Sequence, residues 1–293
     1  MHASPGVTGI FEVNQAWYDM AFAVSDVDEN ELYVGELNVW KSSNGGAAFN
    51  RINSWSNPNG PSYTHADIHN LRFIDGKLFC GSDGGLYVSE DGGNNFTSLT
   101  EGLAIGQFYR IDVSSDSSDS VVGGLQDNGG YARKNEVWQN YYGADGMEVV
   151  IDPTNPENVY GFIQFGGGPY FSQNGGASLL GAVSNPESGN WITPLEFSSE
   201  GRLFAGYTRV YELNFGTNQW EAVSPSFGQN IDRLVLDPND NQIMYAVIYN
   251  SLRRSIDGGL SFQVISNFSS DITWVDVKHG DSNTLYISTS GTG

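Results

Sequence analysis

The sequence predicts an all-β protein built as a seven-bladed β-propeller, and three observations lead to that fold class. A short strand-like phrase returns seven times at intervals of about 40 residues, the period of a four-stranded propeller blade. Turns rich in Asp, Pro, Asn and Gly separate the strand-like runs, and no segment shows sustained helical periodicity. The seven copies of the phrase are 32–35, 78–81, 120–123, 159–162, 203–206, 244–247 and 285–288.

Each repeat is expected to hold four strands in the same order. An alternating strand such as 233–236 comes first, and a turn such as 237–241 (Asp-Pro-Asn-Asp-Asn) follows it, because these residues preset turn dihedral angles or bind their own backbone. The recurring phrase is the second strand. A third strand, a Gly-Gly hairpin and a fourth strand that opens on an aromatic residue complete the repeat, so each repeat makes one blade.

The hairpins share the pattern Ser-x-Asp/Asn-Gly-Gly-x-x-aromatic. The Ser and Asp/Asn side chains can accept or donate hydrogen bonds in the turn, glycine can adopt positive φ, and the aromatic ring can pack between blades. A structural role is therefore predicted for these residues, in preference to a catalytic one for Asp91 and Asp257. The three full copies are Ser42, Asn44 and Phe49; Ser89, Asp91 and Phe96; and Ser255, Asp257 and Phe262, and a degenerate copy begins at Ser172.

These hairpins resemble Asp-box, or BNR, repeats, which sialidases, two-propeller xyloglucanases, sortilin/Vps10 ectodomains and photosystem-assembly propellers share. A closer resemblance covers nearly the whole chain. The order of the segments 65–69, 81–85, 124–130 and 143–147 is similar to that in sortilin-like propellers of large secreted proteins from type IX-secreting bacteria. This resemblance implies an extracellular or cell-surface location. It also implies an export signal and a C-terminal sorting domain in the parent protein, neither of which is found in this sequence.

We therefore expect residues 1–293 to be a single propeller domain and a fragment of a larger secreted protein. The seventh repeat stops at 288–293, before its own hairpin, so the seventh blade is predicted to be incomplete. Alternatively, the strand-like segment 8–13 closes that blade from the other end of the chain, which is the alternative that we favour.

Composition limits the choice of partners. The chain has 13 Lys and Arg against 34 Asp and Glu, a formal net charge of −21. Such a surface repels a phosphate backbone, so nucleic acid is not an expected partner, and no apolar run is long enough to insert into a membrane. The charge is compatible with Ca²⁺ binding or with solubility alone. The single cysteine, Cys80, can form neither an internal disulfide nor a cysteine metal cluster.

The first candidate site is the segment His65-Ala66-Asp67-Ile68-His69. On a strand, residues 65, 67 and 69 share one face, so the two imidazoles and the carboxylate are expected to point the same way. Such a set can bind a transition metal, or it can act in acid/base chemistry near neutral pH. A hydrogen-bonded polar cluster that stabilises the channel wall is the third possibility. No cofactor is certain; Ca²⁺ or a transition metal is the candidate.

A second candidate site groups polar and aromatic residues that follow neighbouring second strands. If the repeats superpose, Asp83 and Asp127 lie at equivalent heights in adjacent blades, with His65 and Asp145 nearby. Carboxylates beside aromatic rings suit a sugar or a cation, and paired carboxylates are what glycoside hydrolysis requires. The alternative is that these residues cap tight turns. The residues expected to contact a ligand are His65, His69, Gln126, Asn128, Trp138 and Tyr142.

The motifs of the enzymatic relatives do not carry over. The segment 49–53 is the nearest match to the Arg-Ile-Pro segment of sialidases and departs from it at the proline, and 35–38 has no Asp where xyloglucanases carry a catalytic one. The sequence therefore favours a binding or interaction propeller that contacts a glycan or a protein and acts as a monomer within a larger chain. A glycoside hydrolase that uses Asp67, Asp83, Asp127 or Asp145 is the alternative, and a metal site at His65, Asp67 and His69 is the second.

Overall fold

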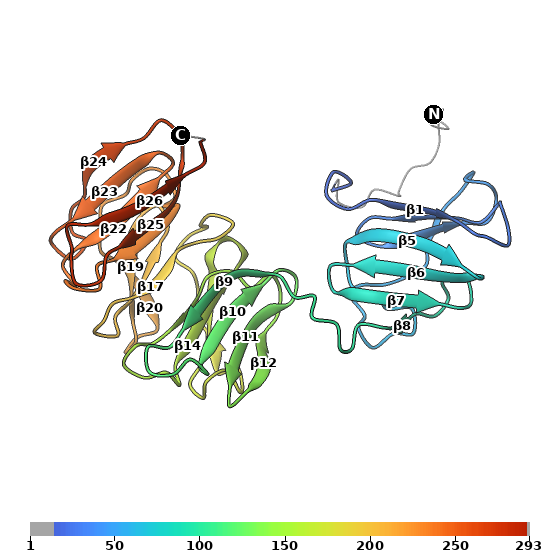
Figure 1. Cartoon of the computed structure of the whole chain (residues 1–293), viewed down its shortest axis with the longest axis horizontal. Coiled ribbons are helices and arrows are strands. Elements are labelled where there is room, and N and C mark those ends of the chain that lie inside the picture. The colour runs from blue at the N-terminus through green and yellow to red at the C-terminus, as the bar shows by residue number, and fades with distance from the viewer. Residues whose placement is uncertain (1–14, 292–293) are drawn as a thin grey trace. The chain divides into compact units, whose positions relative to one another are not determined.

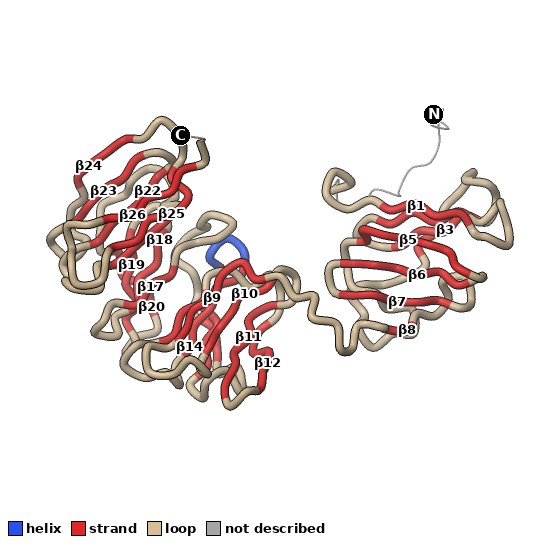
Figure 2. The backbone as a smooth tube through the Cα atoms, in the orientation of Figure 1, coloured by secondary structure: helices blue, strands red, loops and turns tan. Residues whose placement is uncertain are grey.

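The computed structural model describes residues 15–291, and nearly all of its regular structure is β-strand (Figure 2). The strands form antiparallel sheets, each made from strands that are consecutive in sequence. Each of the seven predicted repeats supplies one sheet, and the recurring phrase lies in the second strand of each. Within residues 15–291, no helix is long and apolar enough to cross a membrane.

The chain divides into two compact units, Met1–Gly106 and Gln107–Gly293, which are described separately. Unit 1 contains two four-stranded sheets (Figure 1, blue to cyan). The strands of its first sheet are β1 (Ala21–Val24), β2 (Leu32–Gly35), β3 (Val39–Ser42) and β4 (Asn50–Arg51). Those of its second sheet are β5 (Ile68–Ile74), β6 (Lys77–Ser82), β7 (Gly85–Ser89) and β8 (Thr97–Ser98). Apolar residues that alternate along β1 and β6 pack between the two sheets together with Ile68 and Leu71 of β5, because the side-chain period of a strand is two and β5 has a register shift after Ile68.

Unit 2 contains five sheets, of which the first four have four strands each. The strands of the first two are β9 (Phe108–Val113), β10 (Val121–Leu125), β11 (Gly129–Lys134), β12 (Val137–Tyr142), β13 (Val149–Ile151), β14 (Val159–Ile163), β15 (Gly167–Ser172) and β16 (Gly181–Ala182), with a short 3-10 turn, η1 (Gln164–Gly166), between β14 and β15. The next two contain β17 (Leu195–Phe197), β18 (Leu203–Gly206), β19 (Val210–Asn214), β20 (Gln219–Ala222), β21 (Arg233–Leu236), β22 (Met244–Ile248), β23 (Ser251–Ser255) and β24 (Gln263–Asn267).

The last sheet of unit 2 has two strands in the described residues, β25 (Ile272–Val277) and β26 (Leu285–Thr289). This agrees with the prediction that the seventh repeat is incomplete. The alternative prediction, closure by the segment 8–13, lies outside the described residues. The assignment of residues 1–293 to a single domain also stays a prediction.

The first strands of consecutive sheets lie beside one another in unit 2, so β9, β13, β17, β21 and β25 follow in sequence. A separate apolar cluster fills each space between neighbouring sheets: one between the sheets of β9 and β13, the next beside β17, and so on to β25. This is how propeller blades bury their two faces. As a result, the first strands and the loops that lead into them come together, and side chains from distant repeats can meet there.

The four serine hairpins have the same hydrogen bonds. In the hairpin of Ser89, the hydroxyl of Ser89 donates to Asp91 Oδ1 at 2.9 Å and accepts the amide of Gly93 at 2.8 Å. Asp91 Oδ1 also accepts the backbone amide of Asn95 at 2.9 Å, and the equivalent bond is present in each of the other three hairpins. The equivalent bonds in the other three hairpins start from Ser42, Ser172 and Ser255. These side chains hold their own turns, and their donors and acceptors are engaged locally.

Candidate functional site

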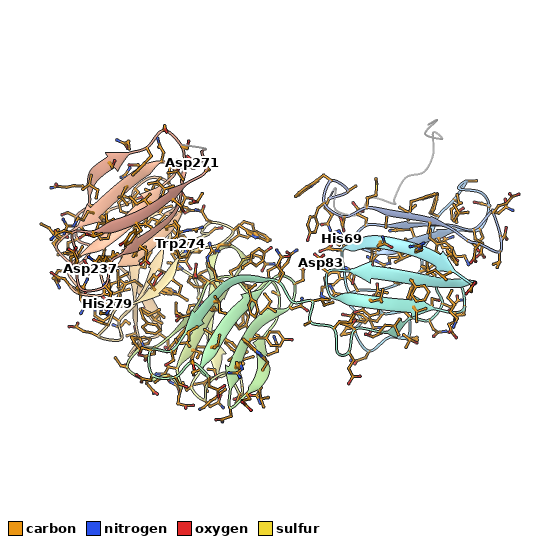
Figure 3. All side chains as sticks on the ribbon, viewed as in Figure 1. His69, Asp83, Asp237, Asp271, Trp274 and His279 are labelled. Carbon is orange, nitrogen blue, oxygen red and sulfur yellow. The ribbon has the colours of Figure 1, made fainter. Side chains whose placement is uncertain are left out.

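Unit 1 brings together part of the first predicted site. Asp83, in the turn between β6 and β7, accepts a hydrogen bond from the Tyr18 hydroxyl at 2.7 Å, and its other oxygen lies 2.5 Å from His69 Nε2. Figure 3 shows His69 and Asp83 side by side. The Tyr18 ring meets the His69 ring edge-on, with centroids 5.0 Å apart. Asp67 lies close by, because one of its carboxylate oxygens is within 4.8 Å of one of Asp83.

Gln15 connects two more carboxyl groups in the same place. Its Nε2 donates to Asp67 Oδ1 at 2.5 Å and to Asp19 Oδ2 at 2.9 Å. Burial raises the pKa of Asp67 to about 6, and the neighbouring charges of Asp19 and Asp83 add to the rise while the bond from Gln15 opposes it. Burial also raises the pKa of Asp19. We call Asp19, Asp67 and Asp83 the unit 1 carboxylate cluster.

The predicted strand through residues 65–69 is wrong in its first half. Asp67 has a φ of +61°, and β5 begins only at Ile68, so the alternation that would align His65, Asp67 and His69 is broken. The His65 ring instead lies against Gly84, where an added Cβ would come within 2.1 Å of it, and its Nδ1 is 3.3 Å from the carbonyl oxygen of Ala66. Asp can adopt the left-handed conformation more easily than most residues, and the strand-like pattern of the segment did not reveal this.

In unit 2, the predicted carboxylates Asp127 and Asp145 meet through a structural bond. The amide of Asp127 donates to Asp145 Oδ1 at 2.9 Å, and the side-chain amide of Gln164 donates to Asp145 Oδ2. Asp145 is buried. Asn128 turns back on the same loop, where its side chain donates to the carbonyl of Gln126 at 2.8 Å. This arrangement matches the turn-capping alternative better than an open sugar site.

The two aromatic residues predicted to contact a ligand have different surroundings. Trp138 is exposed on β12 and packs near the ring of Phe108, with centroids 5.9 Å apart. The prediction that Tyr142 contacts a ligand is wrong, because this residue is buried and its ring stacks on that of Tyr170 with centroids 5.2 Å apart. Its ring occupies the space left open by Gly130, where an added Cβ would clash at 1.9 Å. The sequence shows an aromatic pair at 141–142 but cannot show which ring a neighbouring glycine admits to the core.

A pocket that the sequence did not predict lies where the loops leading into β17, β21 and β25 meet the turn between β22 and β23. Its cavity volume is about 570 Å³. Trp191 and Tyr249 line it, and 44% and 55% of their surfaces are exposed. The other residues that line it are Asn190, Ile192, Asp232, Arg233, Asp271, Ile272 and Thr273. We call it the Trp191 pocket.

Asp232 forms hydrogen bonds with two of the segments that line this pocket. Its Oδ2 accepts the amide of Tyr249 at 2.6 Å, and its Oδ1 accepts the side-chain amide of Asn190 at 2.8 Å. Tyr249 has a φ of +55°, a conformation that costs about 1–3 kcal/mol for a bulky residue and occurs most often at functional sites. Phe165, with a φ of +59°, extends the aromatic surface by meeting the Trp191 ring edge-on at 5.3 Å. The carboxylate therefore fixes loops from two repeats around two exposed aromatic rings.

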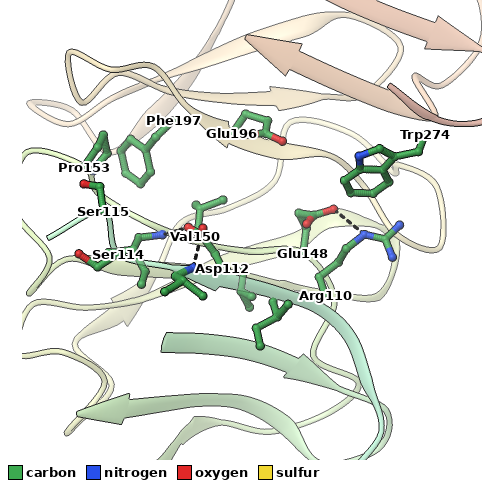
Figure 4. A pocket seen from close by; sticks show the side chains of 14 residues that line it. Arg110, Asp112, Ser114, Ser115, Glu148, Val150, Pro153, Glu196, Phe197 and Trp274 are labelled. Carbon is green, nitrogen blue, oxygen red and sulfur yellow. Dashed lines mark hydrogen bonds and ion pairs between the residues drawn. The ribbon is translucent and has the colours of Figure 1, made fainter. Parts of the chain in front are cut away.

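A second, charged pocket lies along the first strands of unit 2 and has a cavity volume of about 310 Å³ (Figure 4). Arg110 Nε donates to Glu148 Oε2 at 3.2 Å, and the Arg110 and Arg233 guanidinium groups lie 5.5 and 5.3 Å from the centroid of the Trp274 ring. Burial raises the pKa of Glu148 to about 7, although Arg110 and Arg233 oppose that rise. Burial and the charges of nearby carboxylates also raise the pKa of Glu196 well above its ordinary value.

Comparison with known proteins supports the fold. No protein-family model matches the chain. A xyloglucanase of Hypocrea jecorina (strain QM6a) is 27% identical over 188 residues, which are 61% of this chain and 18% of the xyloglucanase. An ancestral GH74 enzyme superposes with a TM-score of 0.50 at 14% identity, over 89% of this chain and 42% of its own. The extracellular domain of a hybrid two-component system from B. thetaiotaomicron gives a TM-score of 0.50 at 13% identity, over 94% of this chain and 39% of its own.

These similarities show that the chain shares an all-β fold with the GH74 enzyme and with the extracellular domain. The chain spans about a fifth of the length of the curated relative that it matches. At these identities, the solved structures bear on the fold alone.

Proposed function

We propose that this protein is a binding propeller whose ligand is a glycan. The observation that carries the proposal is the Trp191 pocket, where exposed Trp191 and Tyr249 lie beside the fixed carboxylate of Asp232. A pyranose ring has an apolar face of C–H groups and a rim of hydroxyls. Aromatic rings stack on such faces, and carboxylate, amide and guanidinium groups bond the rim. The pocket offers both kinds of contact within one cavity large enough for a sugar residue.

The comparisons suggest which glycan to test first. A xyloglucanase and a GH74 enzyme, both named for enzymatic families, share similarity with this chain. Xyloglucan oligosaccharides are therefore the first probe to use. A protein ligand, which the sequence also allowed, is the outcome to pursue if no glycan binds.

The expected result of titrating the purified chain with xyloglucan oligosaccharides is saturable heat release that Trp191→Ala weakens about tenfold or more, because the variant removes the stacking surface. A tenfold loss corresponds to about 1.4 kcal/mol of binding free energy. Trp55→Ala is the matched control, since Trp55 lies in unit 1 and is 45% exposed. Equal losses in the two variants, or no binding of any oligosaccharide across a glycan array, would overturn the proposal.

Glycoside hydrolysis is a second candidate function, and one observation favours it. Carboxylate oxygens of Asp67 and Asp83 lie within 4.8 Å of each other, and retaining glycosidases likewise use two neighbouring carboxyl groups, which are about 5–5.5 Å apart. Hydrolysis predicts that the chain releases new reducing ends from xyloglucan and that Asp83→Asn abolishes the release. An intact polymer after prolonged incubation with the unmodified chain would reject this candidate.

The finer features of the fold belong to the same proposal. We propose that the seven sheets are the blades of one propeller domain that acts as a monomer within a larger, extracellular or cell-surface protein. The even spacing of the repeats along residues 32–288 supports one continuous array, because a blade needs a neighbour on each face.

A further inference from the structure

Three aspartates of unit 1 bring their carboxyl groups to one place although they come from separate segments. Asp19 precedes β1, Asp67 precedes β5, and Asp83 lies in the turn between β6 and β7. Oxygens of Asp67 and Asp83 are within 4.8 Å of each other. Gln15 Nε2 lies 2.9 Å from Asp19 Oδ2 and 2.5 Å from Asp67 Oδ1, so the carboxyl groups of Asp19 and Asp67 are close to each other. Like charges held this closely repel each other, so the arrangement calls for a compensating positive charge.

One oxygen of this cluster is buried without a partner. Asp19 has no solvent-exposed surface, and within residues 15–291 its Oδ1 has no hydrogen-bond partner. Its other oxygen accepts Gln15 Nε2, the group that also bonds Asp67. A buried carboxylate oxygen that lacks a partner is costly, and such groups in native proteins often mark a bound ion or water.

We propose that Asp19, Asp67 and Asp83 bind a hard divalent cation of the Ca²⁺ class. Ca²⁺ takes six to eight oxygen ligands, which include carboxylates and side-chain amide carbonyls. Gln15 can supply such a carbonyl, because its amide group lies between Asp19 and Asp67 and a rotation of the amide would present its oxygen. The net charge of −21 adds a long-range attraction for cations.

The surroundings favour an oxygen-bound cation over the transition metal considered from the sequence. The Nε2 atom of His69 contacts Asp83 Oδ1, and His65 rests against Gly84 with its Nδ1 near a backbone carbonyl. His69 thus orients the carboxylate of Asp83 through a hydrogen bond, as residues that surround the ligands of a metal site commonly do. Most of the potential ligand atoms in the unit 1 carboxylate cluster are oxygens, and oxygen ligands suit Ca²⁺ better than Zn²⁺.

This site does not depend on glycan binding, since the Trp191 pocket lies in the other unit. It does exclude hydrolysis by Asp67 and Asp83, because a carboxylate engaged by a cation is available neither as a proton donor nor as a nucleophile. Cation binding and glycan binding can therefore succeed or fail independently.

The test is titration of the whole chain with Tb³⁺, a luminescent substitute for Ca²⁺. Tyr18 is close enough to sensitise it, because its hydroxyl is 2.7 Å from Asp83. We expect saturable Tb³⁺ emission with one ion per chain, displaced by Ca²⁺ and not by equimolar Zn²⁺. Asp67→Asn is expected to weaken Ca²⁺ binding at least tenfold in calorimetry.

Glu29→Gln is the matched control, because Glu29 is an exposed carboxylate in the turn between β1 and β2 of the same unit. It is expected to keep the affinity of the unmodified chain. If Asp67→Asn does not fold by circular dichroism, Asp83→Asn provides the same test. Absence of stoichiometric Ca²⁺ binding to the unmodified chain would overturn the proposal, and so would equal losses in the control and in the cluster variant, or preferential binding of Zn²⁺.

Discussion

Gly124→Ala is expected to lower the free energy of unfolding by about 3 kcal/mol, the upper end of what overpacking usually costs. A Cβ at Gly124 would lie 2.0 Å from the carbonyl oxygen of Met147 and 2.6 Å from that of Gly146. These are backbone atoms, so no side-chain rotation can relieve the clash. Moving them would strain the bond from the amide of Gly146 to the carbonyl of Leu125, now 2.9 Å long.

The backbone of residues 146–147 passes over that of Gly124 here, and we call this close approach the crossing. Gly143→Ala is the control for this prediction, because Gly143 lies just before the crossing and an added Cβ there meets nothing within 4 Å. The measurement is urea unfolding of the two variants and the unmodified chain, followed by tryptophan fluorescence. We expect the midpoint to fall for Gly124→Ala and to change little for Gly143→Ala. If both variants unfold at the same midpoint as the unmodified chain, the close approach of these backbones does not contribute to stability.

The close approach of these backbones also brings Asp127 and Asp145 together. A Cβ added at Gly146 would lie 2.1 Å from the carbonyl oxygen of Gly129, so these two backbone segments also pass close to each other. Because the two backbones touch, Asp145 can reach the amide of Asp127. The predicted proximity of these two aspartates is correct, but the bonds that they make leave them suited to holding the crossing and less suited to binding a sugar.

The fold was largely predictable, because it depends on a local pattern that recurs. Each copy of the phrase, such as 203–206, carries its own alternation and its own turn residues, and β18 has these same bounds. The serine hairpins were predictable for the same reason: Ser255 and Asp257 bond atoms within six residues of themselves. Local signals of this kind do not depend on how the repeats pack.

The Trp191 pocket was not predictable, because its parts come from different repeats. Trp191, Asp232 and Tyr249 have no common motif, and only the packing of first strands side by side brings them together. The sequence around Trp191 is that of an ordinary loop and does not mark a site. The positive φ of Tyr249 could not be expected either, because bulky residues seldom adopt that conformation.

The carboxylate cluster was half predictable. Asp67 was named as part of the strand-like segment 65–69 and Asp83 because it follows the second copy of the recurring phrase, and carboxylate oxygens of the two lie within 4.8 Å of each other. Asp19 was missed, because it stands alone in a segment with no motif, and its burial becomes visible only in three dimensions. The left-handed turn at Asp67 separates His65 from the face that the strand pattern predicted.

The unfolding free energy is expected to fall as the pH rises from 5 to 8, and Glu196→Gln is expected to reduce that fall. Folding raises the pKa of Glu148 to about 7 through burial, whereas an unfolded Glu titrates near 4.3. The folded chain therefore binds more protons between these values, so the stability contributed by the proton is complete below about pH 4 and is lost as the pH passes 7. From pH 5 to pH 8, Glu148 alone accounts for a loss of about 2.5 kcal/mol.

Glu196 acts in the same direction, because burial and the charges of Glu148, Asp112 and Asp276 raise its pKa further. Arg110 and Arg233 face Glu148 and limit its shift, whereas Glu196 has no hydrogen bond to either in the described residues. Replacing Glu196 by neutral Gln should therefore stabilise the chain at pH 8 and have little effect at pH 4.

Glu200→Gln, at an exposed carboxylate in the turn between β17 and β18, removes the same charge from unit 2 and serves as the control. Urea unfolding of both variants at the two pH values measures the difference. A stabilisation at pH 8 that is equal in Glu196→Gln and Glu200→Gln would mean that overall charge, and not the desolvated carboxyl of this pocket, sets the pH dependence.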